Sequence, residues 1–226
     1  MDSTNKYVKW GIIIVIILLV VWLFSDNHEH FDNFPLRQYK VTFKSGWGDS
    51  SVPISYPPDP HTGTMFLAVH NASYAPFELN GYATPGVQRS AEFGMSDLIA
   101  KEATQGPNAR NVFKTYTGPV LMTPGQKDFI IQSNNDNHYL SFVTMIAPSS
   151  NWFTGASGID LNTVPYGIDI PLYAYDAGTD TGKEFKVLPK QPRIPHVPIS
   201  QIQNGLLFPM NNGSTIPFGY LNITPM

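Results

Sequence analysis

Two neighbouring stretches decide the fold: MIAPSSNWFTGASGID, residues 145–160, and IDIPLYAYDAGTDTGKEF, residues 168–185. The first holds a Ser-Ser-Asn-Trp-Phe turn at residues 149–153. The second ends a strand-like run with Asp176 and Asp180, two carboxylates four residues apart across a glycine. Carboxylates on a tight turn, with an amide oxygen nearby, suit a hard cation such as calcium. The same aspartates could form an Asx-type turn without any metal. The residues alone leave both interpretations open.

Short strand-like runs separated by turn signals occupy most of the chain after residue 38. Tyr39, Val41 and Phe43 alternate with polar neighbours, which is the pattern of a half-buried strand. Clusters of proline, glycine and asparagine separate the runs. The further runs lie at residues 65–70, 129–132, 139–146, 168–175, 184–188 and 218–223. About seven short strands of this kind predict an all-β fold, an antiparallel β-sandwich.

One short helical insertion is expected at residues 85–103. Ser96 could cap a turn whose one face carries Leu98, Ile99 and Ala103. Elsewhere after the N-terminal apolar run, no stretch has a helical pattern long enough for a helix bundle. The insertion is therefore expected to decorate the sandwich rather than to form a domain.

Composition narrows the class of protein. The chain has 226 residues with 20 prolines and 18 glycines against 14% charged residues, a balance typical of strands and turns. A formal net charge of −3 provides no basic patch, so nucleic acid is not an expected partner. The absence of cysteine excludes disulfides, thiol catalysis and cysteine-ligated zinc, and it leaves the redox compartment open.

Catalytic motifs are missing from the sequence. There is no Gly-x-Ser-x-Gly elbow, no His-Glu-x-x-His, no phosphate-binding loop and no dinucleotide fingerprint. His70 and His138 are the histidines inside strand-like runs, and each is expected to be a packed or surface residue rather than a base. The sequence therefore predicts a protein that is not an enzyme.

An uninterrupted apolar run at residues 10–24 follows Lys6 and Lys9. The segment from Tyr7 to Phe24, which contains this run, would span about 27 Å as a helix at about 1.5 Å per residue. That length is close to the roughly 30 Å of a bilayer core. No small-x-small cleavage site follows it, which favours an anchor over a cleaved signal peptide. Lysines on the short N-terminal side predict a single-pass membrane protein with its N-terminus inside and the remainder outside.

The expected organisation has five parts. The proline-rich tail is predicted to run extended along the surface before a last strand closes the sheet. The parts are a short internal N-terminus at residues 1–9, a transmembrane signal anchor at 10–24, a polar tether at 25–37, the β-sandwich at 38–188, and a proline-rich extension with a closing strand at 189–226.

Several segments, in the same order, resemble the spondin N-terminal domain family, which includes F-spondin and mindin. PSSNWFTG and YDAGTDTG, residues 148–155 and 175–182, are similar to the family's Pro-Ser-x-Asp-Trp-Phe-x-Gly and Tyr-Asp-Ala-Gly-Thr-Asp-x-Gly. The likeness covers most of the chain from about Tyr39 to Phe185. Its other segments are YKVTF with GWG (39–43 and 46–48), GYATPGV (81–87), AEFG (91–94) and SFVTMI (141–146).

The resemblance implies a C2-like antiparallel β-sandwich, usually secreted, with adhesion or recognition roles, no enzymatic activity and a calcium ion at one edge. Asp176 and Asp180 match the two aspartates of the family motif. Asn151 stands where the family commonly has aspartate, and an amide oxygen brings no charge, so calcium affinity should fall. The expected metal ligands are therefore Asp176, Asp180 and Asn151.

Two classes of function follow. The first is a membrane-anchored, spondin-like recognition module that binds calcium and contacts a protein or glycan surface in adhesion, with its domain at a cell surface or in a lumen. The second is a minor capsid or membrane-linking structural protein of a large virus particle, placed in an internal membrane of the virion against neighbouring shell proteins.

Overall fold

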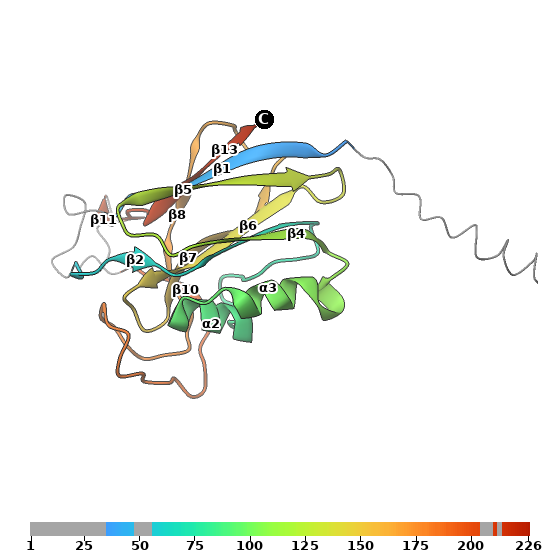
Figure 1. The fold of residues 1–226 in the computed structure, drawn as a ribbon. Helices are drawn as coiled ribbons and strands as arrows, with labels where there is room; N and C mark the ends of the chain where they lie inside the picture. The colour runs from blue at the N-terminus through green and yellow to red at the C-terminus, as the bar shows by residue number, and fades with distance from the viewer. Residues whose placement is uncertain (1–34, 48–55, 204–209, 212–213) are drawn as a thin grey trace, which may run out of the picture. The chain divides into compact units, whose positions relative to one another are not determined.

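The computed structural model describes residues 35–47, 56–203, 210–211 and 214–226. Within these ranges two antiparallel sheets pack face to face, and two short helices cover the outer face of the larger sheet (Figure 1). The expected all-β sandwich with a helical insertion is thereby confirmed. Phe43 of one sheet and Phe142 of the other have ring centroids 4.9 Å apart in the core between the sheets.

The smaller sheet has four strands, and its central pair shows the predicted alternation. Tyr39, Val41 and Phe43 are all buried, while Gln38 and Lys40 are exposed. The closing strand predicted at 218–223 lies between the first strand and a short neighbour, so the end of the chain is part of this sheet. Its order is β5 (Gly125–Ser133), β1 (Arg37–Ser45), β13 (Gly219–Pro225) and β8 (Asp169–Leu172).

The larger sheet has seven strands, and its central ones are buried on both faces. β3 reads MFLAVH without a polar break until its last residue, because one face meets the smaller sheet and the other meets the helices. The order is β10 (Ser200–Gln201), β9 (Ala174–Asp176), β7 (Trp152–Asp160), β6 (Tyr139–Ala147), β3 (Met65–His70) and β4 (Val112–Gly118), with β2 (His61–Thr62) also pairing with β6. A separate pair joins β11 (Met210–Asn211) to β12 (Ser214–Thr215).

The helical insertion consists of two helices, α2 (Pro85–Phe93) and α3 (Asp97–Thr104), followed by a 3-10 turn, η2 (Gly106–Asn108). Gly94 ends α2 in the left-handed conformation. Ser96 lies at the N-cap of α3 as expected, yet its side chain makes no capping hydrogen bond. Its hydroxyl instead accepts a bond from Thr64 at 3.0 Å, which ties the helix to the sheet.

Three strand predictions need correction. Residues 184–188 form no strand; Phe185 alone packs inward, against Trp47 and Trp152. The run at 168–175 divides at Tyr173 into β8 and β9, because the chain crosses there from the smaller sheet to the larger one. β4 and β7 were not predicted as strands.

The N-terminal predictions fall largely outside the described ranges. Residues 1–9, the expected anchor at 10–24 and most of the tether at 25–37 are among the undescribed residues. Of the helices within the described ranges, none is long and apolar enough to cross a membrane.

Candidate functional site

Strand pairing brings the three predicted site residues to one edge of the larger sheet. Asn151 directly precedes β7 and Asp176 ends β9. The register of these two strands sets Trp152 opposite Asp176, so Asn151 lies beside the end of β9. Asp180 follows in the loop after β9. The structure thus brings the three residues together, and their role as metal ligands stays a prediction.

Asn151 and Asp176 are joined by a direct hydrogen bond. The side-chain amide of Asn151, which is fully buried, donates from Nδ2 to Oδ1 of Asp176 at 2.8 Å. The same carboxylate oxygen accepts the backbone N–H of Gly178 at 2.7 Å, which closes an Asx-type turn. The N–H of Ala177 in turn donates to the carbonyl of Asn151 at 3.1 Å. The amide thus holds the turn against the start of β7.

Asp180 is the most deeply enclosed acidic group of the cluster, with 1% of its surface exposed. Its Oδ1 accepts the N–H of Gly182 and its Oδ2 accepts the N–H of Gln191, each at 2.7 Å. The guanidinium of Arg193 donates to the backbone carbonyl of Asp180 at 3.3 Å. A buried carboxylate with both oxygens bonded is stable, and here it fastens the loop after β9 to the proline-rich segment.

Lys190 supplies a positive charge to the same edge. Its Nζ donates to the backbone carbonyl of Glu92 at 2.9 Å and to the carbonyl of Ser150, and it lies 3.9 Å from the Glu92 carboxylate. The ammonium also lies 5.0 Å from the centre of the Phe93 ring. Burial lowers the pKa of Lys190, and the charges of Glu92 and Asp180 oppose that shift.

Lys190 therefore links the proline-rich segment to the end of α2 and to the turn before β7. The role of Lys190 was not predicted from the sequence, because the carbonyls that it contacts are 40 and 98 residues away and no local pattern indicates them. A single lysine in a run of prolines reads as a solvated residue. Only the packed structure shows that it is partly buried.

The contacts of the cluster are made with the protein's own donors. Calcium takes six to eight oxygen ligands, and within the described ranges there is no group of three or more histidine, cysteine, aspartate or glutamate side chains that could hold a metal. Both oxygens of Asp180 already face backbone N–H groups, and Asn151 turns its N–H₂ toward Asp176. These contacts match the Asx-turn alternative, in which N–H groups neutralise the carboxylates.

Comparison with known proteins identifies the family. The pattern of the Spondin_N family matches residues 37–220. The chain is 29% identical to human Spondin-2 over 175 residues and 28% identical to rat Spondin-2 over 176, which is 74% of this chain and 53% of each relative. It is 28% identical to rat Spondin-1 over 170 residues, 70% of this chain and 21% of that protein. The chain thus spans about half the length of the Spondin-2 proteins and about a fifth of Spondin-1. It belongs to the Spondin_N family, the spondin N-terminal domain family.

Proposed function

We propose that this chain is a non-enzymatic recognition module of the adhesion type, held at a membrane by residues 10–24 with its sandwich outside. The family match across residues 37–220 carries this proposal, because it covers the larger sheet, most of the smaller sheet and the edge loops together. The relatives are named spondins, and the adhesive role that the resemblance implies is extended to this chain on that basis. The C2-like description of the sandwich belongs to the same proposal.

The hydrogen-bonded edge supports a role in recognition. Asp180, Asn151 and Lys190 hold three loops in one arrangement through bonds that are partly buried. A surface fixed before contact loses little conformational entropy when a partner binds. The edge therefore suits a rigid platform for neighbouring loops.

The experiment that tests this function asks where the domain lies. Intact cells that make the full chain are treated with a membrane-impermeant biotin reagent, and the membrane fraction is extracted with alkaline carbonate. Biotinylation together with resistance to extraction supports the anchored recognition module. Release by carbonate, or protection from the reagent, contradicts the anchor or its orientation.

The same fractionation separates the two classes of function. Co-purification with a regular particle at fixed stoichiometry would support a structural protein of a membrane-containing virion, with shell proteins as partners. Labelling on intact cells without such a particle supports adhesion to a protein or glycan surface. Calcium binding at Asp176, Asp180 and Asn151 stays a prediction that rests on the resemblance, and its test is given in the Discussion.

A further inference from the structure

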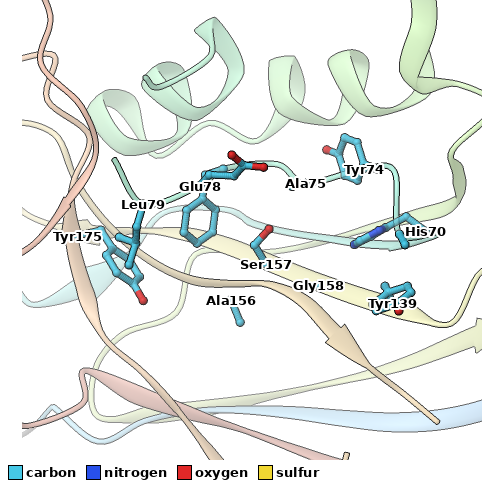
Figure 2. Close-up of a pocket in the computed structure, with 12 residues that line it drawn as sticks. His70, Tyr74, Ala75, Glu78, Leu79, Tyr139, Ala156, Ser157, Gly158 and Tyr175 are labelled. Carbon is cyan, nitrogen blue, oxygen red and sulfur yellow. The ribbon is translucent and has the colours of Figure 1, made fainter. Parts of the chain in front are cut away.

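A pocket of about 560 Å³ lies between β7 and the loop that joins β3 to α2. Its volume is in the range of pockets that hold a small molecule or a side chain. Figure 2 shows His70, Tyr74 and Tyr139 at one end, Leu79 and Tyr175 at the other, and Glu78 between them. Nothing in the network around Asp180 uses these groups.

Aromatic rings form both ends of the pocket and hold one another in place. His70 meets Tyr74 edge to face at 5.1 Å between ring centroids, and it stacks on Tyr139 at 6.1 Å. At the other end Phe77 lies 5.5 Å from Tyr175. Aromatic faces carry partial negative charge, so walls of this kind attract an organic cation.

His70 contributes no positive charge to these walls. Its Nδ1 is 2.7 Å from the carbonyl of Asn71, which can only accept, so Nδ1 carries the proton. Its Nε2 is 2.7 Å from the hydroxyl of Ser141, whose oxygen also accepts the N–H of Gly158 at 3.0 Å. Burial lowers the pKa of His70, and the hydroxyl can therefore donate to a neutral ring.

Glu78 is the one acidic side chain among the residues that line the pocket, and no lysine or arginine lines it. Its side chain is exposed, and within the described part of the chain no basic group pairs with it. An unneutralised carboxylate between aromatic walls favours a ligand of positive charge. Both features point to the same ligand chemistry.

The floor of the pocket is an open sheet edge. β9 pairs with β7 only at residues 152–154, so from Gly155 onward the side of β7 away from β6 has no strand partner among the described residues. Ala156, Ser157 and Gly158 of this stretch line the pocket. Free backbone groups at a sheet edge can pair with an extended peptide, whose alternate side chains then enter adjoining pockets.

We propose that this pocket receives a lysine or arginine side chain from an extended segment of a protein partner, with Glu78 facing the cation and the tyrosine rings flanking it. The proposal rests on the proposed function, since it supplies the contact by which a recognition module would bind. The partner's backbone lies along the free stretch of β7. A basic, extended sequence is the chemical signature of the partner.

The test measures fluorescence anisotropy with the full-length chain and a short, dye-labelled, alanine-based peptide that contains one arginine. The matched peptide carries glutamine in place of the arginine. The arginine peptide should bind more tightly, and its binding should weaken as salt rises. Equal binding of the two peptides, or no binding of either, overturns the proposal.

Two variants locate the contact. Glu78→Gln should weaken binding of the arginine peptide about fivefold, the scale of an exposed ion pair, and Tyr175→Leu should weaken it by removing one ring. Glu184→Gln makes the same substitution at an exposed carboxylate outside the pocket and should leave binding unchanged. Thermal melts of each variant confirm that it is folded. Full affinity in Glu78→Gln overturns the proposal.

A sugar is the other ligand that aromatic walls could stack. Binding of an N-acetylglucosamine oligomer that is lost in Tyr175→Leu but kept in Glu78→Gln, without arginine-dependent peptide binding, would replace the proposal with a glycan site. The outcomes also separate this inference from the proposed function. Arginine-dependent binding by a chain that is not exposed on cells would contradict the proposed function and leave the pocket proposal standing. Surface exposure without peptide binding would contradict only the pocket proposal.

Discussion

Replacing Lys190 by methionine tests whether its partly buried ammonium holds the edge loops together. Methionine keeps an unbranched stem of similar length, so packing near Phe93 is largely retained. The substitution removes two hydrogen bonds from a charged donor, to the carbonyls of Ser150 and Glu92, and the nearby charge that faces the Glu92 carboxylate. The two carbonyls are then left without this donor.

The magnitude follows from these contacts. Hydrogen bonds to charged groups contribute about 1.5–3 kcal/mol each to stability. The lowered pKa of Lys190 shows that burying the ammonium offsets part of this gain. We expect a net loss of about 2 kcal/mol in the free energy of unfolding. For a domain of this size, each kcal/mol shifts Tm by about 2–4 °C, so Tm should fall by about 4–8 °C.

Thermal denaturation followed by circular dichroism measures the change, and Lys186→Met is the matched control. Lys186 is exposed and, within the described residues, its ammonium pairs with the exposed Glu184, so its loss should leave Tm almost unchanged. If Lys190→Met melts within a degree of the wild-type protein, the ammonium contributes nothing and the reasoning is refuted. A similar fall in both variants would point to a general effect of charge instead.

Further predictions concern the other supports of the edge and the ring in the pocket. Asp180→Asn should cost about 2–3 kcal/mol, because an amide turns an N–H₂ group toward one of two buried backbone donors; a chemical denaturation midpoint equal to that of wild type would contradict this. Asp176→Ala should lower Tm in chelator, because the bonds from Asn151 and Gly178 are lost, and should lower it further in calcium if calcium binds there, whereas equal losses in both would show that the residue forms the turn alone. Gly178→Ala should cost more than about 2 kcal/mol, because φ is +75° and a Cβ would meet the carbonyl of Val197; Gly167→Ala, at φ +73° in open space, should show the smaller cost of the backbone angle alone. Burial lowers the pKa of His70, so as pH falls the unfolded chain takes up a proton at this histidine before the folded chain does. The stability that depends on the neutral ring is therefore fully present above about pH 6.5 and is lost as pH falls below that value. Urea melts from pH 7.5 to 5 should therefore show a shallower pH dependence in His70→Gln than in wild type, and an unchanged slope would contradict the buried, neutral ring.

Sequence patterns predicted the strands whose burial is regular. β1 alternates because one face is buried, and β3 is continuously apolar because both faces are. β4 was not predicted because it is a largely exposed edge strand whose residues, VFKTYTG, show no clear alternation. β7 escaped because its glycines and its motif read as a turn. Residues 184–188 were wrongly predicted as a strand because EFKVL alternates between polar and apolar residues, yet only Phe185 of this segment reaches the core.

The site was predicted in its residues but not in its bonding. Asn151, Asp176 and Asp180 were found because their spacing and the family resemblance mark them. Which atoms face each carboxylate depends on long-range contacts, such as the N–H of Gln191 on Asp180, and no local pattern encodes these. The pocket was not predicted for the same reason, since His70, Glu78 and Tyr175 come together only when the sheet forms.

The bonding at the edge bears on why this chain can carry asparagine at position 151. An aspartate there would place a third carboxylate beside Asp176 and Asp180 and would need a cation to offset the repulsion. Asn151 instead donates to Asp176, while backbone N–H groups and the ammonium of Lys190 supply the remaining positive charge. The loops can then hold their shape through the protein's own donors. On this reasoning Asn151→Asp should destabilise the chain in chelator and should gain more stability from added calcium than wild type does. A calcium-independent Tm in that variant would show that the edge has no place for the ion even with the third carboxylate restored.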